Sequence, residues 1–247
     1  MSLISAVNLT KVYGSGDTAV RALDNVSFDV EPGEFVAVMG PSGCGKSTLL
    51  HLLGGLDRPT SGTVTIDGND LTNLSDARLT ELRRHKIGFI FQFFNLIPVL
   101  NAVENAALPI TLDGVRQAEA KEKATDWLRK VGLRERLDHR PDQLSGGQQQ
   151  RVAVARALVA DPALILADEP TGNLDTRAGE EIAALLRQVA NEWGRSVVVV
   201  THDPRIAAHA DRIVFLKDGS IVDQTVLEPA NGRNAEMVVE KMHAFGD

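Results

Sequence analysis

The chain has 247 residues, of which 43% are hydrophobic and 24% charged, so it can bury a sizeable core and is neither disordered, collagen-like nor coiled-coil. Its 33 acidic and 26 basic residues give a net charge of −7, which disfavours a phosphate-backbone-binding face, and we expect no nucleic-acid partner. No apolar run approaches the ~20 residues that span a bilayer, and the first residues lack a secretory signal pattern, so any membrane role is expected to come through a partner.

Residues 1–30 alternate between apolar and polar side chains, which predicts antiparallel strands at an edge of the fold. Four later apolar runs are short and continuous instead of alternating. Such runs are typical of strands buried on both faces, and they indicate a mostly parallel sheet covered by helices. The four runs are residues 35–39, 164–167, 197–200 and 213–216.

Residues 92–159 show helical patterns and lack buried-strand runs, which predicts an inserted helical subdomain. One amphipathic stretch there, residues 118–131, ends at Gly132. Further along, Asp175 is placed to cap a helix with one apolar face, and Gly194 lies where that helix would stop. The fold class predicted is therefore α/β.

A glycine-rich motif directly follows the first buried run, and its pattern of Gly, four residues, Gly-Lys-Ser/Thr is that of a phosphate-binding P-loop. Glycines let successive backbone N–H groups turn toward a polyphosphate, and a helix starting near Lys46 points its positive end at the same anion. Lys46 can reach the outer phosphates, and the Ser47 hydroxyl can ligate Mg²⁺. A buried strand before the motif and a helical run after it disfavour a mere glycine-rich turn. The motif comprises Gly40, Pro41, Ser42, Gly43, Cys44, Gly45, Lys46, Ser47 and Thr48.

Cys44 is the only cysteine, which excludes an intramolecular disulfide and a cysteine-based metal site and favours a reducing compartment. Because Cys44 lies inside the phosphate loop, we expect a maleimide adduct on its thiol to block nucleotide binding. The alternative is a buried, inert thiol that does not react.

Two acidic residues, Asp168 and Glu169, emerge at the end of the buried run 164–167. Ligands of open α/β sheets bind at the carboxyl ends of the strands, beside the expected phosphate loop. Asp168 is placed to hold magnesium through water, and Glu169 to accept a proton from an attacking water. Two acids after a strand are weak evidence by themselves, but together with the P-loop they indicate nucleotide hydrolysis.

A second anion site is indicated by the run Leu-Ser-Gly-Gly-Gln at residues 144–148, the signature motif. Ser145 can cap the helix that follows, and its hydroxyl and the nearby backbone N–H groups then face outward. With this run the chain resembles, over nearly its whole length, the ATP-binding subunits of ABC transporters. The resemblance implies a homodimer formed on ATP binding, in which the signature motif of each subunit completes the ATP site of the other. The nucleotide-contacting residues implied here are Ser145, Gly146, Gly147 and Gln148.

The same resemblance implies roles for further residues. Tyr13 matches an aromatic residue that stacks on adenine, although a core tyrosine of an edge strand is the plain alternative. Gln92 matches a glutamine that senses magnesium and the attacking water, and His202 a histidine that orients water at the γ-phosphate. Asp175 belongs to the run 173–175, which matches a loop that links the two nucleotide sites. The catalytic set implied is Glu169, His202, Gln92 and Lys46, and the metal-binding set is Ser47, Gln92 and Asp168.

The fold implied is a P-loop NTPase core with an antiparallel β edge subdomain and an inserted helical subdomain. We expect one domain over residues 1–247, with the nucleotide-binding core in about 1–91 and 160–247 and the helical part in about 92–159.

Within the family, the sequence is most similar to the macrolide-exporter and lipoprotein-release type of subunit, through residues 88–98, 104–105, 148–151 and 201–203. Asn101 departs from this pattern, because relatives usually have Thr there. This likeness implies an ATPase motor that drives export or mechanical work by an integral membrane permease, from the cytoplasmic face of the cell membrane. The alternative is a cell-division-type relative that regulates cell-wall hydrolases without transport.

Two other classes are disfavoured. Soluble ABC ATPases of DNA repair or translation carry coiled-coil inserts, zinc cysteines or tandem cassettes, which this sequence lacks. A nucleotide-gated binding module without catalysis is disfavoured because both Glu169 and His202 are present.

The run Phe-Phe-Asn-Leu-Ile-Pro at residues 93–98 directly follows Gln92. Adjacent large apolar residues are costly to leave in water, so some are expected to pack against another surface. That surface is either the helical subdomain itself or a short helix of the membrane permease. The resemblance favours the permease, and we expect Leu96→Ser to leave the subunit folded while weakening the contact.

Overall fold

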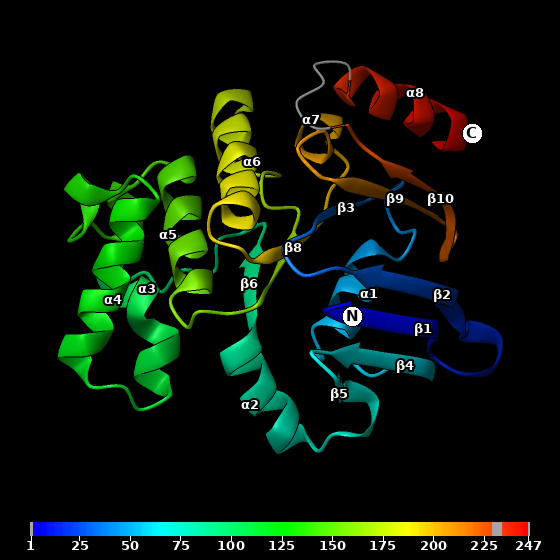
Figure 1. Cartoon of the computed structure of the whole chain (residues 1–247), viewed down its shortest axis with the longest axis horizontal. Coiled ribbons are helices and arrows are strands. Elements are labelled where there is room, and N and C mark those ends of the chain that lie inside the picture. Colours follow the sequence, from blue (N-terminus) through cyan, green and yellow to red (C-terminus); the bar gives the residue numbers. More distant parts are fainter. Residues whose placement is uncertain (1, 229–233, 247) are drawn as a thin grey trace.

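The structure is a computed structural model that describes residues 2–228 and 234–246. Its central six-stranded sheet has the order β10-β9-β3-β8-β7-β6 and is parallel except for β10, which runs antiparallel to β9 (Figure 1). The continuous apolar runs are its inner strands, so the prediction of a mostly parallel sheet is confirmed. The strands are β3 (Phe35–Met39), β6 (Ile87–Phe91), β7 (Leu164–Asp168), β8 (Ser196–Val200), β9 (Arg212–Lys217) and β10 (Ser220–Val226).

A second, four-stranded sheet is antiparallel and has the order β2-β1-β4-β5. Its first two strands come from the alternating N-terminal region, as the sequence predicted. The strands are β1 (Ile4–Tyr13), β2 (Val20–Val30), β4 (Ser61–Ile66) and β5 (Asn69–Asp70).

The helices cover these sheets, and α1 lies between them, in contact with β1 and β2 on one side and β7 and β8 on the other. The inserted helices α3, α4 and α5 stand together on one side of the molecule (Figure 1). The helices are α1 (Lys46–Leu53), α2 (Asp76–Lys86), α3 (Ala102–Leu112), α4 (Gln117–Lys130), α5 (Gly146–Leu158), α6 (Thr176–Asn191), α7 (Pro204–Ala207) and α8 (Asn234–Gly246).

Strand β3 separates two hydrophobic cores. Side chains alternate across a strand, so Phe35 and Met39 join the core shared with α3 to α6, whereas Val36 and Val38 join the core around α1 and the antiparallel sheet. All four side chains are fully buried. The phosphate loop that follows β3 is therefore anchored in both layers.

Helix α5 packs both on the sheet and on the other inserted helices. A Cβ on Gly88 of β6 would lie 2.4 Å from the carbonyl oxygen of Ala157, so only glycine allows α5 to approach this closely. Asn101 begins α3 with a capping box, in which its side chain accepts from the N–H of Glu104 and the Glu104 carboxylate accepts from the N–H of Asn101. Since Asn and Thr both serve at this position, the departure at Asn101 preserves the local structure.

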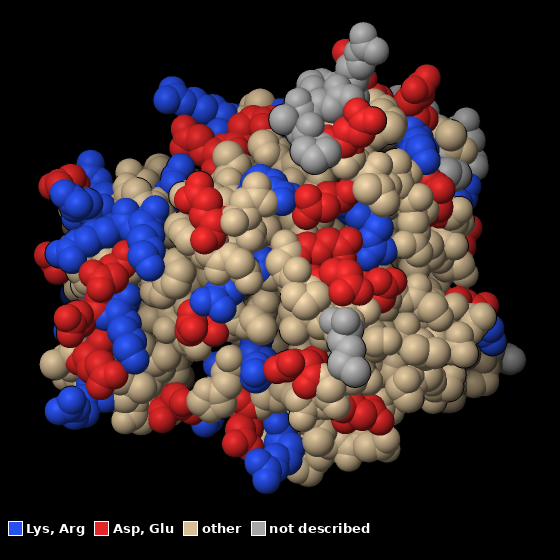
Figure 2. Space-filling view, in the orientation of Figure 1, with Lys and Arg blue, Asp and Glu red and all other residues tan. Residues whose placement is uncertain are grey.

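Acidic and basic side chains are interspersed over the face shown in Figure 2, with many of the basic ones on the side of the inserted helices. Among the described residues, no helix combines the length and the apolar character that crossing a membrane requires.

Candidate nucleotide site

The phosphate loop turns sharply between β3 and α1, and two glycines make this turn possible. Gly40 has φ of 154° and Gly45 has φ of 105°, values that side chains rarely tolerate. A Cβ on Gly40 would lie 2.0 Å from the carbonyl oxygen of Leu216, and one on Gly45 2.3 Å from that of Ala22. Both positions therefore require glycine.

Lys46 and Ser47, the first residues of α1, point their polar atoms toward the loop and the sheet edge. Lys46 is buried, and its Nζ donates to the carbonyl oxygens of Gly40 at 2.8 Å and Pro41 at 2.9 Å. The Ser47 hydroxyl donates to Oδ1 of Asp168 at 3.0 Å. Burial raises the pKa of the Asp168 carboxyl above its usual value, and the hydrogen bond from Ser47 opposes this shift. One oxygen from Ser47 and one from Asp168 thus lie beside the loop, and both are of the kind that Mg²⁺ prefers as ligands.

Glu169 and His202 form a pair at the ends of neighbouring strands. The backbone N–H of Glu169 donates to the carbonyl oxygen of Val200, and φ of Glu169 is 44°. Its Oε1 lies 3.0 Å from Nδ1 of His202, whose side chain is 70% exposed. The other carboxylate oxygen, Oε2, is buried and has no hydrogen-bond partner among the described residues.

Gln92 follows β6 and lies against the loop after Glu169. A Cβ on Gly172 would be 2.7 Å from Nε2 of Gln92, so any larger residue there would require the Gln92 side chain to move. The Asn173 side chain donates to the Gln92 carbonyl oxygen at 3.0 Å. Gln92 and the run 173–175 are thereby joined directly.

One pocket gathers most of the residues predicted for this site. Tyr13 is not among those that line it: the residue is 42% exposed and its hydroxyl donates to Asp57. The Cys44 side chain points into the core and is buried, so only its backbone faces the loop. The pocket is lined by Ala22, Ser42, Gly43, Gly45, Lys46, Ser47, Thr48, Gln92, Glu169 and His202.

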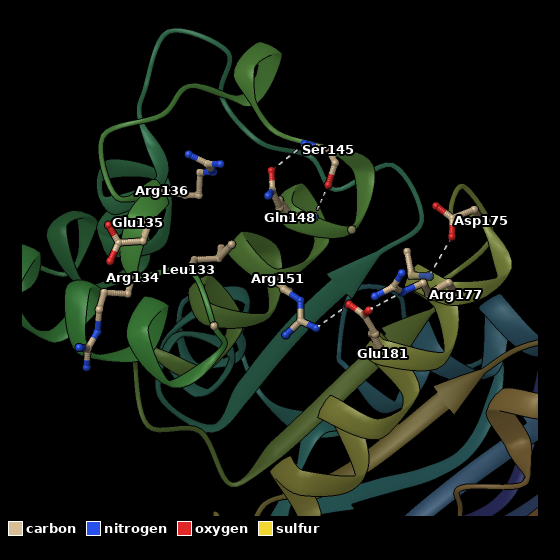
Figure 3. A pocket seen from close by; sticks show the side chains of 13 residues that line it. Leu133, Arg134, Glu135, Arg136, Ser145, Gln148, Arg151, Asp175, Arg177 and Glu181 are labelled. Carbon is tan, nitrogen blue, oxygen red and sulfur yellow. Dashed lines mark hydrogen bonds and ion pairs between the residues drawn. The ribbon is translucent and has the colours of Figure 1, made fainter.

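The signature motif, predicted to form a second anion site, lies at the adjacent N-termini of α5 and α6 (Figure 3). Ser145 caps α5 in a capping box with Gln148, and Asp175 caps α6 by accepting from the N–H of Ala178. The two ends nearly touch, because a Cβ on Gly147 would lie 3.1 Å from that of Ala178. Both predicted caps are confirmed.

Beside these helix ends lies a pocket with several arginines. Arg151 forms an ion pair of 3.0 Å with Glu181, and Arg177 one of 3.4 Å with the same carboxylate (Figure 3). The pocket is lined by Gly132, Leu133, Arg134, Glu135, Arg136, Ser145, Gly147, Gln148, Arg151, Asp175, Arg177, Ala178 and Glu181. It shares no lining residue with the phosphate-loop pocket. Within one chain, the two predicted phosphate-binding ends therefore open into different pockets.

Three residues near the site escaped sequence reasoning. Ala22 of β2 lines the phosphate-loop pocket. From α5, Gln150 contacts the segment that follows Glu169, and Arg156 contacts the segment that follows Gln92. Nothing in the sequence marks Gln150 as buried, because its burial among the apolar residues of α5 is visible only in the structure.

Comparison with known proteins gives a consistent result. The family model described as "ABC transporter" matches residues 23–172. An uncharacterized ABC transporter ATP-binding protein of Thermotoga maritima is 53% identical over 219 residues, which is 89% of this chain and 93% of that protein. The lipoprotein-releasing system ATP-binding protein LolD of Geobacter metallireducens is 49% identical over 221 residues, 90% of this chain and 98% of that protein. The macrolide export ATP-binding/permease protein MacB of Hyphomonas neptunium is 50% identical over 223 residues, 90% of this chain but 34% of that protein.

Two solved structures are also similar to this chain over most of its length. The dimeric structure of MJ0796, described as a bacterial ABC transporter cassette, has a TM-score of 0.84 and 48% identity, and the match covers 91% of this chain and 99% of that chain. A dimeric post-hydrolysis state of the same cassette, bound to ADP and Pi, has a TM-score of 0.83 and 47% identity over the same shares.

Proposed function

Because the chain belongs to the ABC transporter family, as an ATP-binding subunit that hydrolyses ATP, we propose that it is the motor of a membrane export or mechanotransmission machine. In this proposal two copies close head to tail around two ATP molecules, and hydrolysis reopens them. Any ligand that binds only the closed dimer stabilises it by mass action. Opening and closing then move an integral membrane permease.

The separation of the two phosphate-binding ends carries this proposal. The phosphate-loop pocket and the pocket beside the signature motif have no lining residue in common. Each pocket thus offers a single phosphate-binding end, and a two-fold dimer would bring each loop opposite the signature motif of the other copy. Dimeric relatives of nearly the same length support this arrangement.

Within each site, the residues at the start of α1 hold the phosphates. Lys46 would exchange its carbonyl partners in the loop for phosphate oxygens, and the backbone of residues 40–48 would cradle them. Ser47 and Asp168 fit Mg²⁺ because both offer oxygen ligands 3.0 Å apart. When bound, Mg²⁺ neutralises charge on the phosphates. Tyr13 would stack on adenine after leaving its hydrogen bond to Asp57.

The residues at the strand ends act on water. One carboxylate oxygen of Glu169 is held by His202. The second is buried, has no partner within residues 2–228 and 234–246, and would accept the proton of an attacking water. His202 orients that water at the γ-phosphate. Gln92 senses the water, and movement at the γ-phosphate would pass through Gln92 into the segment that follows. Asp175 would link the two sites through α6, whose first turn it caps.

The permease would dock on exposed apolar side chains after Gln92. Phe93 is 72% exposed, Val99 71% and Ile97 37%, in contrast to Leu96, which packs against the core. This apolar surface, defined by Phe93, Ile97 and Val99, fits a short helix from a permease. We place the subunit at the cytoplasmic face of the cell membrane. The names LolD and MacB of the relatives support export or mechanical work, and they give no support to the cell-division alternative.

The test removes the proton acceptor. Glu169→Gln keeps the side-chain shape, so ATP binding should persist while turnover falls by at least about 10²-fold. The trapped ATP should then hold a stable dimer, which gel filtration with ATP detects. Normal hydrolysis by a Glu169→Gln variant that stays monomeric would falsify the role of Glu169.

A further inference from the structure

One side chain of α5 bridges the two segments that carry the water-acting residues. Gln150 is fully buried. Its Nε2 donates to the carbonyl oxygen of Pro170 at 2.6 Å and to that of Phe91 at 3.4 Å. Pro170 directly follows Glu169, and Phe91 directly precedes Gln92. A single amide therefore connects α5 with the residue that follows Glu169 and with the residue that precedes Gln92.

The amide also carries a cost that an apolar residue would avoid. Its Oε1 is buried and has no hydrogen-bond partner within the described residues. A buried acceptor without a partner costs free energy, and an apolar side chain of similar volume in place of Gln150 removes that cost. In return, Gln150 donates two hydrogen bonds that an apolar side chain at this position could not form.

The loop that Gln150 holds is confined on several sides. Glu169 is fixed to β8 by the bond from its N–H to Val200, and Gly172 lies against the Gln92 side chain. The N–H of Gly172 donates to the Glu169 carbonyl oxygen, which closes a tight turn. Pro170 lies within this turn, so its carbonyl is the point at which α5 sets the position of the loop.

We propose that Gln150 is a positioning residue for hydrolysis, which fixes Glu169 and Gln92 relative to each other and to the signature end of α5. This inference rests on the proposed function. Ser145 begins the same helix, so the amide makes the geometry of the chain's own hydrolytic residues depend on the helix that meets the nucleotide of the other copy. Gln150 itself touches no substrate.

The experiment compares Gln150→Met with Gln188→Met. Methionine keeps the length of the side chain and removes both donors. Gln188 lies half-buried on α6 and donates only to Glu192, so it undergoes the same chemical change away from both pockets. For Gln150→Met we expect kcat to fall at least about 10-fold, since misplacing catalytic groups costs that much or more. KM and the Kd for a fluorescent ATP analogue should stay within about 3-fold of wild type. Gln188→Met should keep the wild-type kcat.

A second readout separates positioning from folding. Glu169→Gln carrying Gln150→Met should still form the ATP-dependent dimer, because the phosphate loop and the signature motif remain intact. A folded Gln150→Met variant with kcat within about 2-fold of wild type overturns the inference, and so does loss of the ATP-dependent dimer. If Gln150→Met does not fold, Gln150→Leu, which is apolar, of similar size and has no donor, is judged by the same criteria. Failure of both to fold assigns Gln150 a structural role and overturns the inference. A wild-type chain without ATPase activity would instead contradict the proposed function.

Discussion

Glu169 concentrates two local costs at one residue. Its φ of 44° lies in the left-handed region, which costs a non-glycine residue on the order of 1 kcal/mol, and its Oε2 is buried without a partner in the part of the chain that the structure describes. Strained backbones of this kind cluster at functional sites, held by the surrounding structure. Here the bond from the Glu169 N–H to Val200 holds the conformation and turns the carboxylate toward His202.

Cys44 is the residue for which the structure changes the expected chemistry. Burial raises the pKa of its thiol, against the opposing charge of Lys46, so at neutral pH less of it is thiolate than in an exposed cysteine. Its Sγ would lie 2.8 Å from a Cβ on Gly40, which places it in the floor of the loop. These features favour the buried, inert thiol over the accessible one.

We therefore predict that a maleimide labels the folded protein at least about 10-fold more slowly than the urea-unfolded chain, with little inhibition during the time of an ATPase assay. Mass spectrometry of the labelled chain measures both rates. Fast labelling that ATP prevents would instead show that the Cys44 thiol is accessible in the folded protein. The Cys44→Ala variant, which has no cysteine, controls for reaction at other residues.

At the scale of single elements, local signals in the sequence predicted some boundaries and missed others, such as the end of α6 at Asn191, before Gly194. Asp175 and the apolar spacing after it predicted α6, and the observed helix, Thr176–Asn191, starts at that cap. Non-local packing was not predictable, because periodicity shows that a face is buried and not against what. The edge-on contact of Trp127 with Trp193, at 5.0 Å between rings, is such a case. Gln150 is another, since a glutamine in a helix has no sequence signal that distinguishes burial from exposure.

The segment after Gln92 shows the same limit. Its apolar run predicted a contact surface, and the exposed side chains fit that prediction, but Leu96 packs against the core. The backbone is fixed from two helices: Arg156 donates to the carbonyl oxygens of Phe94 and Asn95, and Asn105 bonds to Ile97. The apolar surface is thus held rigidly on α3 and α5.

Two serine variants should separate core from surface in this segment. Leu96→Ser removes half-buried apolar contacts, so it should destabilise by about 1–3 kcal/mol and lower Tm by about 3–10 °C. Phe93→Ser alters an exposed side chain, so Tm should move by no more than about 2 °C and basal ATPase activity should stay normal. Thermal melting and ATPase assays measure these effects. Phe93→Ser should lower the stimulation of ATPase activity by the membrane permease without lowering Tm. Equal melting of the two variants would contradict the division drawn here.

At the scale of the whole molecule, the proposed function divides ATP hydrolysis between two separate pockets of each chain. The phosphate loop is anchored by β3 between two hydrophobic cores, and the signature motif stands at the end of an inserted helix. Because the two pockets share no lining residue, the proposed function assigns half of an ATP site to each of them. A defect in the loop and a defect in the signature motif should therefore fall on different ATP sites when two such chains pair.

Mixing two defective chains tests this division. Lys46→Ala removes the phosphate-binding cation of the loop, and Ser145→Arg blocks the anion site at the start of α5; each is combined with Glu169→Gln so that bound ATP persists. Neither variant alone should form a dimer with ATP, because both of its sites would carry the defect. In a mixed dimer one site receives both defects and the other receives none, so an ATP-dependent dimer should appear only in the mixture. Gel filtration measures it, with Glu169→Gln as the positive control and omission of ATP as the negative one. If the mixture elutes as the separate chains do, the loop and the signature motif do not share a nucleotide across two copies.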